Sequence, residues 1–156
     1  MIFLILYLLL FTNIYCELLL SRGKPAYQSS VYEDYHAGYA VDGNNGQHLE
    51  KHKCSQTSND NRPWWMVNLT VEAKITLVTI FNRQDQFSER IEGAVVEVLD
   101  KNDEVTGLCG IVMADNSVIN LWCNQRAGIF GSKVRVKLER QEYLTLCEVE
   151  VYGVRE

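Results

Sequence analysis

The amino-acid sequence predicts a single all-β domain, an antiparallel β-sandwich, and three observations support this fold class. Short apolar or alternating runs recur after residue 17, polar segments typical of turns separate them, and no amphipathic helix of convincing length is present. Strands at this spacing without crossover helices favour antiparallel sheets packed face to face. With 156 residues the chain can bury one core but is too short for two ordinary domains.

The expected strands follow the hydrophobic pattern. In Lys133–Leu138 and Cys147–Tyr152 apolar side chains alternate with polar ones, as on a strand with one buried face. Ile75–Phe81 is apolar on both faces, which predicts a central strand. Further strands are expected at Met66–Leu69, Gly93–Leu99 and Val118–Cys123, with turn-like segments at residues 100–103, 114–117 and 124–128.

The N-terminus is predicted to be a signal peptide. Residues 1–16 carry no charge and are mostly apolar, so we expect cleavage near Glu17 and a mature domain of residues 17–156. The alternative is a membrane anchor, but an uncharged run of this length falls short of the ~20 residues that a spanning helix needs. The mature chain is therefore expected to be secreted, without membrane insertion.

The charge balance excludes some partners. Fifteen Lys and Arg against 20 Asp and Glu give a net charge of −5, all of it after residue 16. Nucleic acids and anionic membranes favour clustered Lys and Arg, so neither is an expected partner. Charged residues make up 22% of the chain and aromatic residues are plentiful, which also argues against disorder.

Four cysteines remain after the predicted cleavage, and four cysteines allow three pairings. Cys109 and Cys123 flank one short stretch and are paired as a local disulfide, which leaves Cys54 to pair with Cys147 across most of the domain. The alternative, four buried thiols, does not suit an oxidising compartment. The sequon at Asn68 predicts a glycosylation site consistent with export.

Two candidate catalytic arrangements lack the required pattern. His48 and His52 have the spacing of helical zinc ligands, but Glu50 stands in the third place between them, which fits neither zinc-protease motif, and the segment is polar and loop-like. Asp85 and Glu89 resemble a glycosidase pair, but the flanking arginines would keep both ionised and remove the general acid. No nucleophile elbow or nucleotide-binding glycine loop is present, so we do not expect an enzyme.

The segment Asn82–Arg90 has the composition of a sugar-binding turn. It places two guanidinium groups, two carboxylates and one aromatic ring between two predicted strands. A neutral sugar needs fixed donors for its hydroxyls and an apolar surface for its C–H face, and an arginine oriented by a carboxylate supplies such donors. The alternative is a solvated hairpin with surface ion pairs worth ~0–1 kcal/mol each.

Five segments spread over residues 17–156 match one known family in order and approximate spacing: Gly23–Ser30, His36–Asn44, Arg62–Leu69, Asn82–Arg90 and Glu142–Gly153. With these segments the chain resembles the F-type lectins, or fucolectins, which are related to tachylectin-4 and to discoidin-like domains. The resemblance implies a discoidin-like jelly roll and a lectin that binds fucosylated glycans in innate-type recognition.

The resemblance also implies roles for individual residues. Arg83 and Arg90 would donate hydrogen bonds to fucose hydroxyls and the ring oxygen, and Asp85 would orient Arg83. The position of the family's histidine holds Gln56, whose amide can donate but lacks a rigid ring. His52, in the same loop, is a second candidate for that role.

Phe87 would replace the family's adjacent pair of cysteines as the apolar wall of the sugar site. If the change at Gln56 left one sugar hydroxyl unpaired, binding would weaken by ~1–3 kcal/mol.

A structural calcium ion is the cofactor that the resemblance implies. Oxygen ligands from a glycine-containing loop and the C-terminal strand suit a hard cation. The alternative is an ordinary turn at Asp42–Asn44. The ligands would be the carboxylates of Asp42 and Glu148, the side-chain oxygen of Asn44, and the backbone carbonyls of Tyr39, Lys53 and Cys147.

Trp64, Trp65 and Trp122 are predicted to pack in the protein and not to form a sugar platform. Two other functions remain open: an adhesion or protein-interaction module that has lost fucose binding, and a lipid-binding module with Ile129–Phe130 as an exposed apolar tip. Because one domain holds one site, strong binding to glycans would require a homo-oligomer.

Overall fold

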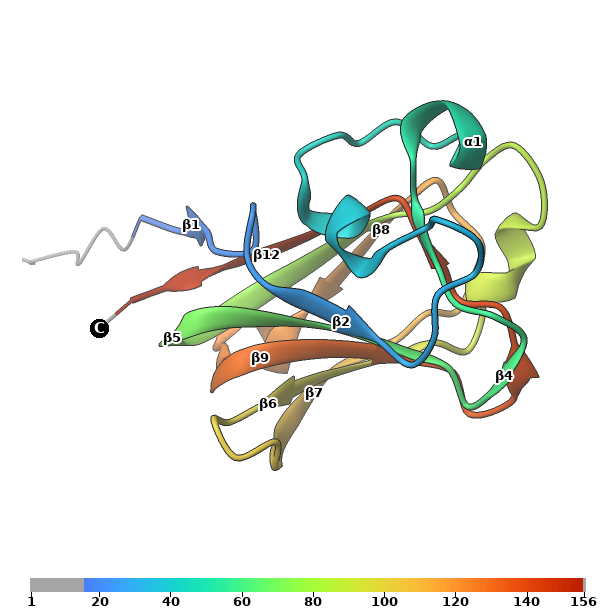
Figure 1. Ribbon diagram of the computed structural model, residues 1–156. Helices are drawn as coiled ribbons and strands as arrows, with labels where there is room; N and C mark the ends of the chain where they lie inside the picture. Colours follow the sequence, from blue (N-terminus) through green and yellow to red (C-terminus); the bar gives the residue numbers. More distant parts are fainter. Residues whose placement is uncertain (1–15, 156) are drawn as a thin grey trace, which may run out of the picture.

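The computed structural model describes residues 16–155, so residues 1–15 of the predicted signal peptide lie outside the described residues. The described chain is a helix-poor β-sandwich in which every strand pair is antiparallel, as predicted (Figure 1). Its strands are β1 (Leu18–Leu19), β2 (Ala26–Gln28), β3 (Ser55–Gln56), β4 (Asp60–Asn61), β5 (Trp64–Phe81), β6 (Val95–Leu99), β7 (Val105–Ile111), β8 (Val118–Trp122), β9 (Ile129–Lys137), β10 (Gln141–Glu142), β11 (Thr145–Leu146) and β12 (Glu148–Val154).

One long strand, β5, connects the two layers. Along its first half it pairs with β2 and β9, and along its second half it pairs with β12 and β8. The pairing with β9 changes register between Asn68 and Ala73, which is the irregularity that lets β5 bend. The main path of pairing runs β1-β12-β5-β9-β6-β7, and β10-β4 and β11-β3 form two small ribbons.

The predicted strands are confirmed with changes at their ends. Ile75–Phe81 is central, with strands paired on both sides, but it belongs to the same strand, β5, as Met66–Leu69. Thr70 lies between the two runs in a left-handed conformation (φ 63°), where the pairing with β9 changes register. The strand predicted at Val118–Cys123 ends one residue early, since Cys123 begins a 3-10 helix. The helical turns are η1 (Ala37–Val41), α1 (Leu49–His52), η2 (Ser88–Ile91) and η3 (Cys123–Arg126).

The prediction that His48–His52 stays a loop without an apolar contact was wrong. Leu49–His52 forms the single-turn helix α1, and the Leu49 side chain is buried against Tyr35 and the two half-cystines Cys54 and Cys147. One apolar residue is enough to dock a turn this short, because the disulfide presents an apolar surface beneath it.

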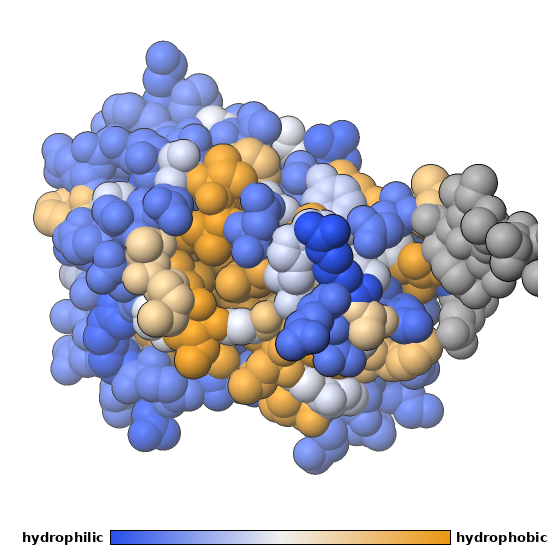
Figure 2. All heavy atoms as spheres, turned by 180° about the vertical axis from the view of Figure 1, so that it is seen from behind, coloured by the Kyte–Doolittle hydropathy of each residue, from blue (hydrophilic) through white to orange (hydrophobic). Residues whose placement is uncertain are grey.

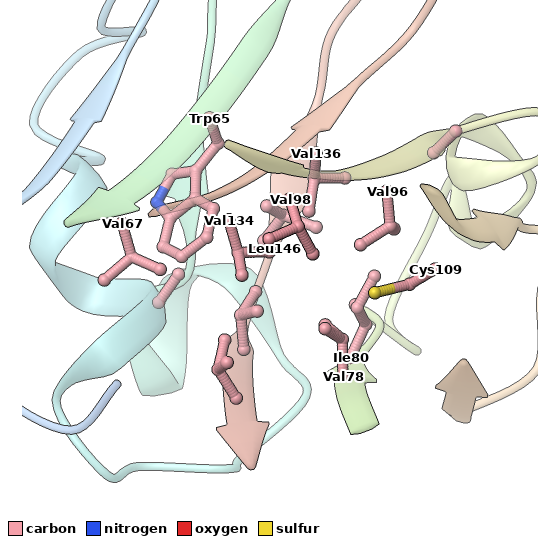
Figure 3. Close-up of a cluster of buried hydrophobic side chains, with 14 of the residues drawn as sticks. Trp65, Val67, Val78, Ile80, Val96, Val98, Cys109, Val134, Val136 and Leu146 are labelled. Atoms are coloured by element: carbon pink, nitrogen blue, oxygen red, sulfur yellow. The ribbon is translucent and has the colours of Figure 1, made fainter. Parts of the chain in front are cut away.

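The core lies between the layers and is built from valine, isoleucine and leucine side chains around Trp65 (Figure 3). Trp65 is fully buried and its indole N–H donates to the Ala37 carbonyl at 3.0 Å, whereas Trp64 is half-buried. The prediction for Trp122 was wrong, because this ring is 37% exposed. Ile119 and Cys123 point inward from this stretch, so the strand alternation turns Trp122 outward, where the Arg126 guanidinium lies 4.0 Å from its ring centre.

Both predicted disulfides are present: Cys54 pairs with Cys147 and Cys109 pairs with Cys123. Exposed apolar side chains concentrate on β7 and β8, and Figure 2 shows a band of apolar surface bordered by hydrophilic residues on the face seen from behind. The residues of β7 and β8 that are exposed in this way are Val105, Leu108, Ile111, Val118 and Trp122. Across residues 16–155, no helix has the length and apolarity needed to cross a membrane.

Candidate functional site

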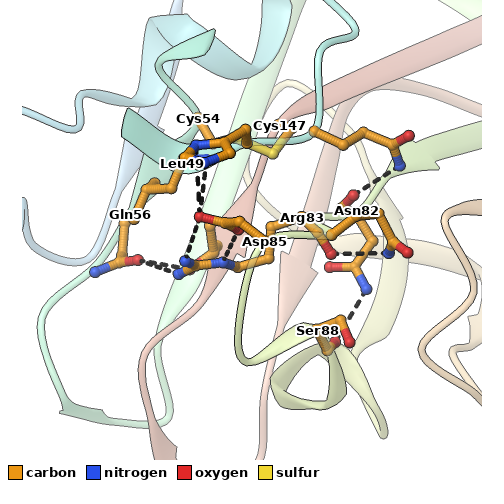
Figure 4. A network of polar contacts seen from close by, with 12 residues as sticks. Leu49, Cys54, Gln56, Asn82, Arg83, Asp85, Ser88 and Cys147 are labelled. Atoms are coloured by element: carbon orange, nitrogen blue, oxygen red, sulfur yellow. Dashed lines mark hydrogen bonds and ion pairs between the residues drawn. A yellow bond between two sulfur atoms is a disulfide. The ribbon is translucent and has the colours of Figure 1, made fainter. Parts of the chain in front are cut away.

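The turn that follows β5 is held in place by the buried side chain of Asn82. Its amide nitrogen donates to the Ser88 carbonyl at 2.9 Å, and its backbone N–H donates to the Ser117 carbonyl at 3.0 Å. Gln47 donates in turn to the Asn82 carbonyl at 2.7 Å. These bonds connect the turn to two other loops at the end of the sandwich where α1 lies (Figures 1 and 4).

Arg83 and Asp85 form a two-pronged ion pair within this turn. Arg83 Nε lies 2.8 Å from one Asp85 oxygen and Nη2 lies 2.9 Å from the other, as Figure 4 shows. Arg83 as a whole residue is only 5% exposed. Asp85 also accepts a hydrogen bond from the Leu49 backbone N–H at 3.3 Å. The carboxylate therefore fixes the direction of the guanidinium.

The charge state of Asp85 follows from the same contacts. Burial raises the pKa of the Asp85 carboxyl, but the hydrogen bonds and charge of Arg83 outweigh burial, so this pKa lies below its ordinary value. The pair consequently stays ionised at neutral pH.

Gln56 lies beside Arg83, although the two residues are far apart in the sequence. Its side-chain oxygen accepts hydrogen bonds from Arg83 Nη1 at 3.3 Å and from the Thr145 hydroxyl at 2.9 Å. The amide nitrogen points away from Arg83 in Figure 4 and makes no hydrogen bond with any residue of 16–155. Gln56 thus offers a donor at the site, while its oxygen holds a second edge of the guanidinium.

Phe87 and Arg90 complete the turn. The Phe87 ring is 47% exposed and lies between the two arginines, with its centre 4.0 Å from Arg90 Cζ and 5.7 Å from Arg83 Cζ. Arg90 Nε also lies 3.3 Å from a carboxylate oxygen of Glu142. The structure therefore brings together all five residues predicted for the sugar site: Gln56, Arg83, Asp85, Phe87 and Arg90.

The second histidine candidate is not in contact with this group in the described chain. The His52 ring packs closely on Gly46, where an added Cβ would clash with it, and the His52 carbonyl accepts a hydrogen bond from the Asn44 side-chain amide at 3.2 Å. His48, which the sequence analysis considered only as a zinc ligand, lies with Nδ1 3.8 Å from Asp85 Oδ2. It lines an open hollow of about 410 Å³ with Leu49, Glu50, Arg83, Asp85 and Gln86.

No signal in the sequence would have selected His48. Its approach to Asp85 depends on the docking of α1, which brings together residues 37 positions apart in the chain (85 − 48).

A buried carboxylate lies at the predicted calcium site. Glu148 is buried, one of its oxygens accepts the Gly43 N–H at 3.1 Å, and the other has no hydrogen-bond partner within residues 16–155. Burial, followed by the nearby Asp42 charge, raises the pKa of Glu148 to about 7. A buried oxygen without a partner beside a second carboxylate is unfavourable unless a cation binds there, so these residues fit a calcium ion.

The other predicted ligands lie around the same loop. Asp42 accepts the Asn44 N–H at 2.7 Å, and Lys53 ends α1 in a left-handed conformation while its ammonium group pairs with Asp34 at 2.9 Å. No group of three or more His, Cys, Asp or Glu side chains suited to a metal occurs in the described part of the chain. The ligand set predicted for calcium contains only two carboxylate side chains, those of Asp42 and Glu148, and its other ligands are amide and carbonyl oxygens.

The predicted glycosylation site lies at the bend of β5. Asn68 is half-buried, and its side-chain oxygen accepts the Thr70 N–H at 2.9 Å. Glycosylation of this residue stays a prediction.

Comparison with known proteins gives consistent results for sequence and structure. The family model described as a NedA-like, galactose-binding domain matches residues 39–136. Fucolectin-6 from Anguilla japonica is 40% identical over 136 residues, which cover 83% of this chain and 72% of that protein.

Solved structures of sugar-binding modules have folds similar to that of this chain. A fucose-binding module from Streptococcus pneumoniae has a TM-score of 0.81 at 29% identity, covering 88% of this chain and 96% of the module. The lectin domain of Lectinolysin complexed with Lewis B antigen has a TM-score of 0.81 at 25% identity, covering 88% of this chain and 98% of that domain.

Proposed function

The chain belongs to the fucolectin family of carbohydrate-binding modules, which are lectins and not enzymes, and on this premise we propose that it binds terminal L-fucose on glycans. The observation that carries the proposal is the two-pronged pair of Arg83 and Asp85. A guanidinium fixed in this way presents its remaining N–H groups in one direction, as recognition of adjacent sugar hydroxyls requires.

Each residue of the site has a defined task in this proposal. Arg83 and Arg90 donate hydrogen bonds to fucose hydroxyls and the ring oxygen, Asp85 orients Arg83, and the Gln56 amide nitrogen supplies the donor that histidine supplies in the family. Phe87 offers its exposed ring to the apolar face of the sugar. The donors act together, because hydroxyls left unpaired in a partly buried site would weaken binding.

Calorimetric titration of methyl α-L-fucoside tests the proposal. We expect Arg83→Lys to lower the affinity at least tenfold, because a lysine cannot occupy two carboxylate oxygens with a planar fork. Arg135→Lys is the matched control, since Arg135 makes a similar contact to Glu97 at 2.8 and 2.6 Å outside the site. Equal affinity in the wild type and Arg83→Lys would contradict the proposal.

The alternative function is an interaction module that has lost fucose binding through the change at Gln56. The two functions differ in one experiment: the wild-type chain binds the fucoside if the amide nitrogen is an adequate donor, and only Gln56→His binds it if the amide is not. The contacts of Gln56 with Arg83 and Thr145 favour the first outcome, because they hold the amide in one orientation.

We also propose that calcium stabilises the loop beside this site. Asp42, Asn44 and Glu148 would hold the ion with the carbonyls of Tyr39, Lys53 and Cys147, and bound calcium would neutralise the buried Glu148 carboxylate. We expect calcium to raise the melting temperature of chelator-treated protein, and Glu148→Gln to lose this response. Glu150→Gln is the matched control on the same strand, and a wild-type melting temperature that calcium leaves unchanged would contradict the proposal.

Secretion, the removal of residues 1–16 and a role in innate-type recognition accompany this proposal as predictions. The uncharged N-terminus, the two disulfides and the Asn68 sequon support export. Expression in cultured animal cells tests export, with N-terminal sequencing and glycosidase treatment of the protein recovered from the medium.

A further inference from the structure

A row of aromatic rings continues from the site beyond Arg90. The centre of the Tyr143 ring lies 4.9 Å from Arg90 Cζ, and the Tyr32 ring meets Tyr143 edge-on with centres 5.5 Å apart. Phe87 lies on Arg90 as well, at 4.0 Å. We call Phe87, Tyr143 and Tyr32 the aromatic row.

The backbone around Tyr32 is tied to the site. The Tyr32 N–H donates to the Gln56 carbonyl at 3.0 Å, and the Gln28 amide donates to the carbonyls of Ser30 at 2.6 Å and Gln56 at 3.0 Å. Because the Gln56 side chain contacts Arg83, these bonds place Tyr32 at the border of the same site. The row is therefore held in place before any ligand binds.

The exposure of Tyr32 and Phe87 is not explained by folding, whereas Tyr143 is half-buried. Tyr32 is 37% exposed and Phe87 is 47% exposed, although apolar rings gain stability from burial. Phe87 also has a φ of 57°, a left-handed conformation that is costly for a residue other than glycine. An exposed ring in a strained backbone, next to a binding site, is a feature expected of ligand contact.

The two borders of the site differ in chemistry. The hollow beside α1 is lined by polar and charged groups, including His48 and Glu50, whereas the part of the site around Arg90 carries the aromatic row. The ring of a hexose has an apolar C–H face, and aromatic side chains are the surfaces that bind such a face.

We propose that Tyr32 and Tyr143 form a second subsite, which binds the apolar face of the hexose joined to fucose. The glycan then leaves the site over the aromatic row and not over α1. This inference rests on the proposed fucose binding and adds to it a ligand class: oligosaccharides in which fucose is linked to a hexose. Tyr143 has a second task, since its ring also braces Arg90.

The test compares two ligands by calorimetry, methyl α-L-fucoside and 2′-fucosyllactose. We expect the wild type to prefer the trisaccharide by roughly three- to tenfold, the range of one aromatic contact. Tyr32→Ala should lower this preference to nearly one, and Tyr32→Phe should keep it, because the ring and not the hydroxyl makes the contact. Tyr143→Ala should weaken both ligands, because Arg90 loses its support.

Tyr27→Ala is the matched control, since Tyr27 is an exposed tyrosine on β2, outside the aromatic row and the site residues. We expect it to keep the wild-type preference. Melting temperatures of all variants confirm folding, and Tyr32→Leu, which removes the aromatic ring but keeps an apolar side chain, provides the readout if Tyr32→Ala does not fold.

Four results would overturn the inference. Equal wild-type affinity for the two ligands, or an unchanged preference in Tyr32→Ala, would show that no second subsite exists at Tyr32 while the proposed function stands. Loss of the preference in Glu50→Ala alone would place the hexose over α1. Absence of binding to both ligands would overturn the proposed function and this inference with it.

Discussion

Replacing Asp85 with asparagine tests the central contact of the site with little change in size. Asp85 makes bonds of 2.8 and 2.9 Å to the Arg83 guanidinium. Asparagine keeps one acceptor oxygen but replaces the other with an N–H₂ group, which cannot accept a bond from the guanidinium. The variant therefore loses one bond and the balancing charge at the same time.

The expected magnitude follows from the burial of Arg83. Removing one partner of a buried ion pair costs about 3–5 kcal/mol, because the other charge is left without compensation. Arg83 is 5% exposed, but the remaining Asn oxygen and the Gln56 oxygen still accept from it. We expect the free energy of unfolding to fall by about 2–3 kcal/mol, and the affinity for fucoside to fall about ten- to a hundredfold as the guanidinium loses its fixed direction.

Urea unfolding and calorimetric titration of methyl α-L-fucoside measure the two effects. Asp103→Asn is the matched control, because Asp103 pairs with Lys133 at 2.6 Å but its side chain is 59% exposed. Exposed pairs contribute about 0–1 kcal/mol, so this control should change neither stability nor binding appreciably. If folded Asp85→Asn bound fucoside as tightly as the wild type, orientation of Arg83 by Asp85 would be refuted as the basis of recognition.

Three further predictions concern stability and assembly. Burial raises the folded-state pKa of Glu148 from 4.5 to about 7, so as pH rises this carboxyl ionises first in the unfolded state. The free energy of unfolding of chelator-treated protein should therefore fall as pH rises from 4.5 to about 7. Urea unfolding measured at each pH should show this slope in the wild type and a flatter slope in Glu148→Gln. Replacing Cys54 and Cys147 with alanine should lower the free energy of unfolding by about 2–5 kcal/mol, and an unchanged urea midpoint would contradict this stability effect. The same variant should respond less to calcium, because Cys147 directly precedes the predicted ligand Glu148. The exposed apolar side chains of β7 and β8 are the surface through which the predicted homo-oligomer would form. In that case Leu108→Asp should shift the mass measured by light scattering towards that of one chain. An oligomer whose mass does not change in Leu108→Asp would exclude this surface.

Much of the fold could be predicted because its signals are local. The alternation in Lys133–Leu138 reports one buried face, and the doubly apolar run Ile75–Phe81 reports a strand with neighbours on both sides. The spacing of Arg83, Asp85 and Arg90 in one turn is also local, so their proximity needed no knowledge of distant contacts. Resemblance to a family added Gln56 and the loop around Asp42.

What the sequence by itself determined is therefore the strands β5, β6, β8, β9 and β12, the Cys109–Cys123 pair and the residues of the central turn, because each depends on periodicity or short spacing, whereas β7 (Val105–Ile111) was not predicted. Tertiary structure alone decided which histidine lies near Asp85, and that Tyr143 lies against Arg90 with Tyr32 beside it. These features depend on how residues 37 (48 to 85) and 111 (32 to 143) positions apart pack together, and the physical reason is that docking of α1 and the bend of β5 are set by the packed core. A local pattern carries no information about such contacts.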